Sequence, residues 1–336
     1  MAVDGNQVKG PDEPKFIAAA VQAAPAFLDL GAGVAKAQTL IAQAADAGAR
    51  LIVFPELWLP GYPWWIWLGA PAFGMQFMPR YVENALHRDS EEMRSLCEAA
   101  RRHKIHVVLG YAEKAGGTLY IAQSLIGEDG SVLAHRRKLK PARIERSVFG
   151  QGDGSDLAVV DTPLGRLGAL SCGEHFQPLL KSAMYLQSEQ IHAAAWPAFS
   201  LLRGRAYLNG PEAATMASQM YAIEGQCFVL CATTVNDRAT LDIVCQTDEH
   251  RKLLTVDGLD AAGGRSNIFG PDGAPLGQYL PEGEEGLVLA EIDLSALHLA
   301  KTASDTFGHW SRPDVVRLMV NRKPAPPVVE LKDIQP

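Results

Sequence analysis

Long uninterrupted apolar segments are absent from this sequence, and so is an apolar leader at its start. Prolines and glycines break the richest apolar stretch, 57–75, whereas a membrane-spanning helix needs about 20 consecutive apolar residues. The polar N-terminus, MAVDGNQVKGPDEPK, contains no apolar core that would direct export. The sequence therefore predicts a cytoplasmic protein that does not enter a membrane.

Cysteines are few. The five, at positions 97, 172, 227, 231 and 245, are an odd number with no paired CxxC spacing. This pattern favours free thiols in a reducing compartment and matches no usual zinc site.

An excess of positive charge is also missing. The formal net charge of the 336 residues is −7, which argues against binding to nucleic acid or to an anionic membrane surface. The nearest basic cluster is HRRKLKPARIER at 135–146. We interpret most of it as a solvated strand end and loop, with Lys138 and Glu145 as exceptions.

What the sequence does contain is an alternation of buried strands and helices. Strands are predicted at 16–25, 50–56, 105–114, 165–172, 191–197, 227–235 and 286–294, with strand–turn–strand units at 118–139 and 265–279. Helices are predicted at 31–49, 90–104, 176–189 and 211–226. This order indicates an α/β sandwich with mixed sheets. We expect a disordered segment over 1–15, one catalytic domain over 16–316 and an extended, Pro-rich tail over 317–336, which could contribute oligomer contacts.

Cys172 is the strongest candidate for a reactive side chain. It lies in SCGEH, where a buried strand ends and a helix is expected to begin. The unpaired N–H groups of a helix start stabilise a thiolate. A buried structural thiol is the alternative, and we favour that interpretation for the other four cysteines.

A nucleophilic cysteine needs a base, and Glu56 is the best candidate. It ends the apolar strand LIVFPE, where burial would raise its pKa towards the range useful for proton transfer. The alternative is a glutamate that turns out into solvent. Strand alternation places Lys138 on the opposite face from Arg137, so it could point inward beside a carboxylate, although a surface lysine is the usual outcome.

Three segments in order carry a resemblance to a known family. VFPELWLPGYPWW, HRRKLKPARIERSVFGQGDGSD and GALSCGEHFQPLLK resemble the signature segments of the nitrilase superfamily, and AAWPAF and GHWSRPDV add to the match. The nearest branch is that of the true nitrilases, of the arylacetonitrilase and aliphatic kind. The resemblance runs from about Phe16 to about Val316.

The resemblance implies roles for four residues. Cys172 would be the nucleophile, Glu56 the general base, Lys138 the cationic stabiliser, and Glu145 the second glutamate beside the site. A thiolate would attack the nitrile to form a thioimidate, and water would then convert it through a thioester to a carboxylic acid and ammonia. No metal or organic cofactor is implied. The family's fold is a four-layer αββα sandwich, and its members form homo-oligomers, built from dimers and sometimes extended into spirals or filaments.

The same resemblance gives a set of pocket residues. Eight are expected to contact substrate: Tyr62, Trp64, Gly173, Glu174, His175, Trp196, Pro197 and Phe199. Trp65 and Trp67 are interpreted as ordinary core. His309 matches a histidine near the end of nitrilase domains, for which a structural or interface role is as plausible as a catalytic one.

Gly173 is the departure from the family pattern, because nitrilases of this branch usually have tryptophan after the cysteine. A glycine would leave volume empty at the pocket wall and free the backbone beside the nucleophile. We therefore expect tolerance of bulkier or α-substituted nitriles and a changed ratio of acid to amide product.

The sequence as a whole predicts an enzyme that hydrolyses organic nitriles, with a small-molecule nitrile and water as its partners. The alternatives are a cyanide dihydratase, an amidase or carbamoylase of the same superfamily, and a non-catalytic assembly protein. The complete set of Glu56, Lys138, Glu145 and Cys172 argues against the last.

Overall fold

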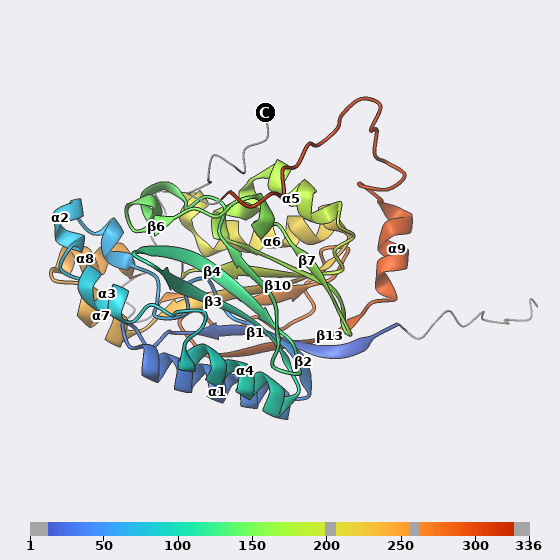
Figure 1. The fold of residues 1–336 in the computed structure, drawn as a ribbon. Coiled ribbons are helices and arrows are strands. Elements are labelled where there is room, and N and C mark those ends of the chain that lie inside the picture. The colour runs from blue at the N-terminus through green and yellow to red at the C-terminus, as the bar shows by residue number, and fades with distance from the viewer. Residues whose placement is uncertain (1–12, 199–205, 256–261, 326–336) are drawn as a thin grey trace, which may run out of the picture.

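Two halves of one β-sheet pack face to face between two layers of helices in the computed structural model (Figure 1). The structure describes residues 13–198, 206–255 and 262–325. This arrangement confirms the expected four-layer αββα sandwich. No helix in the described part of the chain is long and apolar enough to cross a membrane.

One half of the β-structure is built from the N-terminal strands and one strand from near the C-terminus. Its order is β13 (Gly286–Asp293), β1 (Lys15–Ala23), β2 (Ala49–Val53), β3 (His106–Ala115), β4 (Thr118–Ile126) and β5 (Val132–Arg137). β2 runs parallel to β1 and β3, and the other neighbours are antiparallel. The short β6 (Phe149–Gly150) adds to β4.

The other half comes from the second part of the chain. Its order is β12 (Asn267–Phe269), β10 (Phe228–Asn236), β9 (Ile191–Trp196), β8 (Gly165–Ser171) and β7 (Val159–Thr162), with β11 (Ala262–Gly263) also on β10. β8, β9 and β10 are parallel. β1 and β10 pair through two residues each, so the two halves form one continuous sheet folded back on itself.

Helices cover both outer faces. α1 (Leu30–Asp46) and α4 (Glu91–His103) lie against the first half, and α5 (Pro178–Tyr185) and α6 (Pro211–Gly225) lie against the second (Figure 1). Helices at one end of the sandwich are α2 (Pro71–Gly74), α3 (Met78–Glu83), α7 (Arg238–Val244) and α8 (Asp248–Leu254), and α9 (Ala296–Ala303) lies towards the opposite end. These five short helices were not among the predicted elements.

Strand alternation divides the core into separate layers. On β1, Ala19 and Val21 pack under α1 and α4, whereas Ala18 and Ala20 face the inter-sheet core with Ala193 of β9. The small alanines allow the two halves of the sheet to approach closely.

Two predicted boundaries differ from the structure. The predicted N-terminal segment 1–15 overlaps β1, which begins at Lys15, and its first 12 residues lie outside the described range. The second strand of the 265–279 unit is reduced to a single bridge between Phe269 and Pro275, because Pro275 has no N–H to donate to a ladder.

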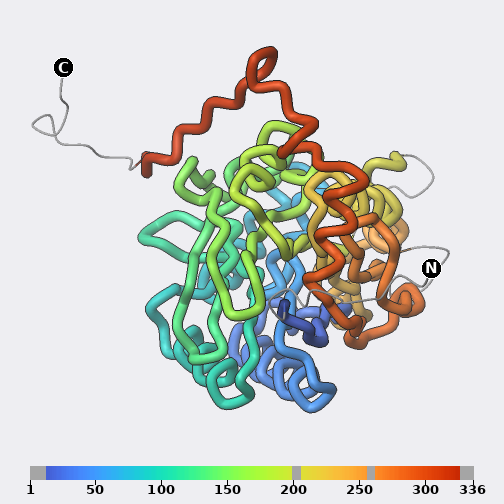
Figure 2. The backbone as a smooth tube through the Cα atoms, turned by 90° about the vertical axis from the view of Figure 1, so that its right-hand side faces the viewer, coloured from blue at the N-terminus to red at the C-terminus, as the bar shows by residue number. Residues whose placement is uncertain are grey.

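The C-terminal segment arches over the body and returns to it (Figure 2). The Arg322 guanidinium donates hydrogen bonds to the carbonyl oxygen of Leu157 and to Oε1 of Gln187. The backbone N–H of Ala325 donates to a carboxylate oxygen of Asp153 at 2.7 Å. The described part of the tail is therefore attached to the rest of the fold near β7 and α5.

Candidate active site

Four reactive side chains meet where strands of the two halves end. Glu56 follows β2, Lys138 follows β5 directly, and Cys172 follows β8. Glu145 lies in the short 3-10 helix η2 (Arg143–Ser147). The carboxyl ends of parallel strands lie at one edge of a sheet, and the folded-over sheet brings the edges of both halves together at this point.

Lys138 connects the two glutamates. Its Nζ donates hydrogen bonds to Oε2 of Glu56 at 3.0 Å and to Oε2 of Glu145 at 2.9 Å. The side chains of Glu56 and Glu145 and the sulfur of Cys172 each offer an atom within 4.8 Å of the others. All four residues are at most 3% exposed.

Burial and charge set the protonation of these groups. Burial raises the pKa of Glu56 to about 8, although the ammonium of Lys138 opposes this. Burial also raises the pKa of the Cys172 thiol, again opposed by Lys138. For Lys138, burial favours the neutral amine, but the carboxylates of Glu145 and Glu56 outweigh it and raise its pKa. The resting site therefore holds a thiol beside an ammonium.

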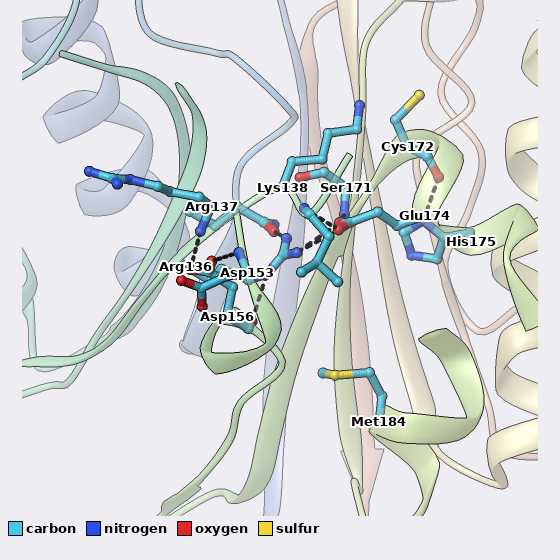
Figure 3. A network of polar contacts seen from close by, with 12 residues as sticks. Arg136, Arg137, Lys138, Asp153, Asp156, Ser171, Cys172, Glu174, His175 and Met184 are labelled. Atoms are coloured by element: carbon cyan, nitrogen blue, oxygen red, sulfur yellow. Dashed lines mark hydrogen bonds and ion pairs between the residues drawn. The ribbon is translucent and has the colours of Figure 1, made fainter. Parts of the chain in front are cut away.

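The backbone at Cys172 adopts an unusual conformation. Its φ angle is +46°, in the left-handed region that few non-glycine residues occupy. Cys172 begins the 3-10 helix η4 (Cys172–Phe176) immediately after β8. After this change of direction, the sulfur of Cys172 and the end of the Lys138 side chain lie in the same part of the site (Figure 3), close enough for their charges to interact.

Glu174 holds this turn from one side. Its carboxylate accepts two hydrogen bonds from Arg136, both at 2.8 Å, and one each from the N–H groups of Leu139 and Ser171 (Figure 3). Burial opposes ionisation, but Arg136 and these N–H groups keep the pKa of Glu174 below its usual value. The Arg136–Glu174 pair thus fixes the end of β5 to the start of η4.

The environment of Arg136 corrects one expectation. We predicted that most of the 135–146 cluster is solvated, but Arg136 is only 2% exposed. It lies on the same side of β5 as Lys138, and Gln123 and Glu174 satisfy its guanidinium. Arg137, on the opposite side, pairs with Glu113.

A cavity of about 190 Å³ opens beside the nucleophile. Cys172 and Glu145 form its reactive wall, and Trp67, Phe176 and Leu208 supply apolar surface. Gly173 also lines it, and a Cβ built there would meet only the Cβ of Ala142, at 3.6 Å. A side chain at this position would therefore project into space that is now open.

The other pocket residues expected from the sequence lie around the cavity rather than in its wall. Tyr62 is buried behind Glu145, to which its hydroxyl donates a hydrogen bond at 3.1 Å. Trp64 packs on Tyr62 with ring centroids 4.5 Å apart. Trp196 and Pro197 are buried at the end of β9.

Glu174 and His175, which were also expected to contact substrate, are not among the residues that line this cavity. Both side chains are buried. Their polar atoms are satisfied by the backbone: Glu174 accepts hydrogen bonds from N–H groups, and His175 donates from Nδ1 to the carbonyl oxygen of Cys172. Phe199 lies outside the described residues. His309 is exposed and pairs with Asp305.

Several cavity residues were missed from the sequence. Trp67 was interpreted as core, yet it is half-buried, lines the cavity and donates a hydrogen bond to the hydroxyl of Tyr62. Phe176 could have been suspected, since it lies in the turn that follows the nucleophile. Leu208 and Asn209 come from the short helix η5 (Tyr207–Asn209), for which the sequence carries no motif.

The cluster also offers atoms that could bind a metal ion. Glu56, Glu145 and Cys172 have the ligand types and proximity for it. However, the ammonium of Lys138 already lies between the two carboxylates. Organic chemistry by the cysteine, supported by an internal cation, fits this arrangement better.

Known proteins resemble this chain over most of its length. The model of the carbon-nitrogen hydrolase family matches residues 17–302. A nitrilase of Pseudomonas syringae pv. syringae (strain B728a) is 52% identical over 94% of this chain and 93% of that protein. An arylacetone-specific nitrilase of Alcaligenes faecalis is 47% identical over 90% of this chain and 84% of that protein.

A solved structure shares the fold. The C. elegans NitFhit protein superposes with a TM-score of 0.69 at 23% sequence identity, and the match covers 94% of this chain and 70% of that one. At this level of identity the likeness concerns the fold alone.

Proposed function

The chain belongs to the carbon-nitrogen hydrolase family and, within it, to the nitrilases; on that premise we propose that Cys172 is the nucleophile, Glu56 its general base and Lys138 the cationic stabiliser. The enzyme hydrolyses organic nitriles to carboxylic acids and ammonia. We assign Glu145 to a supporting role, holding Lys138 in place.

One observation carries this assignment. Lys138 forms hydrogen bonds to both buried glutamates, next to a buried cysteine that opens on a cavity. Oε2 of Glu56 is bound by Lys138, whereas Oε1 has no partner among the described residues. That free oxygen is available to accept a proton, since a buried polar atom without a partner is costly unless it has a task.

The reaction follows from these positions. Ionised Glu56 removes the thiol proton as Sγ attacks the nitrile carbon, and Lys138 stabilises charge on the nitrogen of the resulting thioimidate. A first water, activated by Glu56, adds to the thioimidate, and ammonia leaves. A second water cleaves the acyl-thioester, which releases the acid and restores the thiol. Two waters are consumed for each nitrile.

The cavity supports a medium-sized organic substrate. Trp67, Phe176 and Leu208 suit an aromatic or aliphatic group, which favours arylacetonitriles or aliphatic nitriles over cyanide. Gly173 leaves open the space that a larger side chain would fill. We propose that this space accepts substituents at the carbon next to the nitrile, and that it alters the ratio of acid to amide.

Ammonia release from phenylacetonitrile tests the proposal. The wild-type enzyme is expected to release ammonia, and Cys172→Ala is expected to release none. Cys97→Ala, which removes a half-buried thiol in α4, is the matched control and should keep full activity. Release from cyanide or amides but not from nitriles would instead favour the other activities of the superfamily, and activity in Cys172→Ala would contradict the assigned nucleophile.

We also propose that the enzyme assembles through its α5–α6 face. Exposed apolar side chains gather there: Phe176, Leu179, Leu186, Met216, Met220 and Ile223. A patch of this kind is typical of an interface, and a second copy of the chain would cover it to form a dimer. The described segment that follows α9 carries further exposed apolar residues, among them Trp310 and Met319, which would suit contacts between dimers in a spiral or filament.

A cytoplasmic location is part of the proposal. All five cysteines are unpaired in the structure, as expected for a protein in a reducing compartment.

A further inference from the structure

A continuous row of buried side chains runs from the nucleophile's backbone into the layer under α6. His175 Nδ1 lies 2.8 Å from the carbonyl oxygen of Cys172, and His175 Nε2 lies 3.0 Å from Nε2 of His192. His192 Nδ1 lies 2.7 Å from Oε1 of Glu189, and the hydroxyl of Tyr221 donates to Oε2 of Glu189 at 2.6 Å. Glu189 and the two histidines are at most 3% exposed, and Tyr221 is fully buried.

The direction of each hydrogen bond can be deduced from one end. A carbonyl oxygen only accepts, so His175 must donate from Nδ1 to Cys172. If His175 is neutral, its Nε2 accepts, and the proton between the rings belongs to His192. A neutral His192 then has a bare Nδ1, which also accepts. Glu189 must therefore supply the proton of the last hydrogen bond as a carboxylic acid.

The charged alternatives contain the same number of protons. Moving the proton of Glu189 onto His192, or onward to His175, would create a carboxylate and an imidazolium in the interior. Burial disfavours both charges, because neither group has contact with water. Burial raises the pKa of Glu189 to about 8, and burial lowers the pKa of both histidines.

The groups around Glu189 favour the neutral arrangement. The titratable side chains that face it are His192 of β9, Tyr221 of α6, Tyr185 of α5 and Cys227 at the start of β10. In the part of the chain that the structure describes, no lysine or arginine pairs with Glu189. It therefore lacks the cation that stabilises Glu174 on the other side of the same turn.

We propose that Glu189 is a positioning residue that carries a proton at neutral pH and, through His192 and His175, holds the carbonyl of Cys172 so that the nucleophile keeps its left-handed backbone. This inference rests on the proposed function, in which Cys172 attacks the nitrile. Glu174 holds the N–H of Ser171 on one side of the turn, and the row that starts at Glu189 holds the carbonyl of Cys172 on the other.

Close packing fixes the row in place. A Cβ added to Gly168 of β8 would lie only 2.0 Å from Oε1 of Glu189, so the carboxyl packs directly on the glycine. The rings of His192 and Tyr221 stack with centroids 3.7 Å apart, and Trp196 stacks on His175 at 4.9 Å. This close packing leaves the side chains of Glu189, His192 and His175 little room to form other hydrogen bonds.

Two substitutions of Glu189 test whether this position needs a hydrogen-bond donor or a negative charge. In Glu189→Gln the amide nitrogen can donate to His192 while its oxygen accepts from Tyr221, so kcat and KM should stay within about threefold of wild type. Glu189→Leu has a similar size but no donor, so kcat should fall roughly 10- to 100-fold, as for a misplaced reacting group. KM should change little, because the cavity walls are unaltered.

The proton itself can be observed without substrate. The infrared spectrum of the wild type at neutral pH should contain the C=O stretch of a protonated, buried carboxyl that is absent from Glu189→Gln. Glu56 contributes a band of its own, and only the difference between the two proteins assigns Glu189. This readout stands even if Glu189→Leu fails to fold, and even if nitriles prove not to be the substrate.

Three results would overturn the proposal. If no carboxyl band is lost in Glu189→Gln, the residue is ionised. If Glu189→Gln loses as much activity as Glu189→Leu, a charge rather than a donor is required. If both variants match the wild type, the row does not position the nucleophile. Loss of nitrile hydrolysis in the wild type, with the carboxyl band present, would instead count against the proposed function alone.

The pH dependence of stability gives an independent check. A carboxyl whose pKa rises from 4.5 to about 8 on folding binds a proton in the folded state that the unfolded chain releases between those values. The contribution of Glu189 to wild-type stability should therefore fall as pH rises through this window. Glu189→Gln lacks this proton, so its melting temperature relative to wild type should increase from about pH 5 to about pH 8. A constant difference would contradict the assigned protonation.

Discussion

The ammonium of Lys138 binds two buried carboxylates, and this arrangement sets the pKa of Glu56 and therefore the pH at which it can act as a base. Glu145 binds the same ammonium and also raises the pKa of Glu56 through like charge. The two glutamates therefore have different roles: Glu145 keeps its hydrogen bond to Lys138, while Glu56 exchanges protons with the thiol and with water.

The pH profile of hydrolysis should reveal this arrangement. Only ionised Glu56 accepts the thiol proton, and burial raises its pKa to about 8, so kcat/KM should rise with pH up to about that value. Initial rates of ammonia release across the pH range would show this rising limb of the pH profile. Glu145→Gln removes the neighbouring charge, so the limb of its residual activity should move to lower pH. A limb near the ordinary value of 4.5 would contradict a buried base.

Gly173 should control the size of the substrate. Gly173→Trp places an indole in the open space next to Ala142, so rates on bulky α-substituted arylacetonitriles should fall by about tenfold or more, because each filled contact costs on the order of 1–3 kcal/mol. Rates on unsubstituted arylacetonitriles should change less. Gly173→Ala is the control, since its Cβ fits at 3.6 Å. Equal relative rates across the three proteins would rule out this role.

At the scale of elements, the active site depends on how β8 ends. Cys172 changes direction with φ +46°, and the Arg136–Glu174 pair ties this turn to β5. Both side chains are almost fully buried. Removing one member of such a pair leaves an uncompensated charge in the interior.

Arg136→Met should therefore destabilise the enzyme by roughly 3–5 kcal/mol and reduce kcat, because the turn loses its anchor on β5. Arg137→Met is the matched control. Its partner Glu113 keeps Arg88 and His135, so the loss should be within about 1 kcal/mol, with activity retained. Urea unfolding and nitrile turnover of both variants measure the difference. Equal losses in the two variants would show that the Arg136–Glu174 pair has no special role.

The elements that place the site were predictable because they are local. Apolar runs ending at Glu56 and Cys172 predicted strands, and alternation on β5 put Lys138 opposite Arg137. Arg136 shares a side with Lys138, but the same alternation could not reveal its distant partner Glu174. The cavity could not be predicted either, because Leu208 and Trp67 meet only when segments far apart in sequence fold together.

At the scale of the whole molecule, the nucleophile lies close to the face proposed for dimer contacts. Phe176 lines the cavity and is also 41% exposed, and Leu179 of α5 is 70% exposed beside it. Covering this face would therefore enclose part of the entrance to the site as well as bury apolar surface.

Charge introduced on this face should prevent assembly. The double variant Leu179→Glu, Met216→Glu places carboxylates on α5 and α6, and its mass in solution should fall from that of an oligomer to that of a single chain, because burying unpaired charge is costly. Light scattering after size exclusion measures this. Val132→Glu, at a 48% exposed site on β5, should keep the wild-type mass. An unchanged mass in the double variant would place the interface elsewhere.

The folded-over sheet has a consequence for cutting the chain. β5 and β8 stand far apart in the strand order, yet Lys138 at the end of one and Cys172 at the end of the other form a single site. A break between them would put the base and the cation on one fragment and the nucleophile on the other, and β13 of the second fragment would still pair with β1 of the first. Neither fragment could hydrolyse a nitrile alone. Turnover would return only on reassociation, which makes this enzyme suited to use as a split reporter.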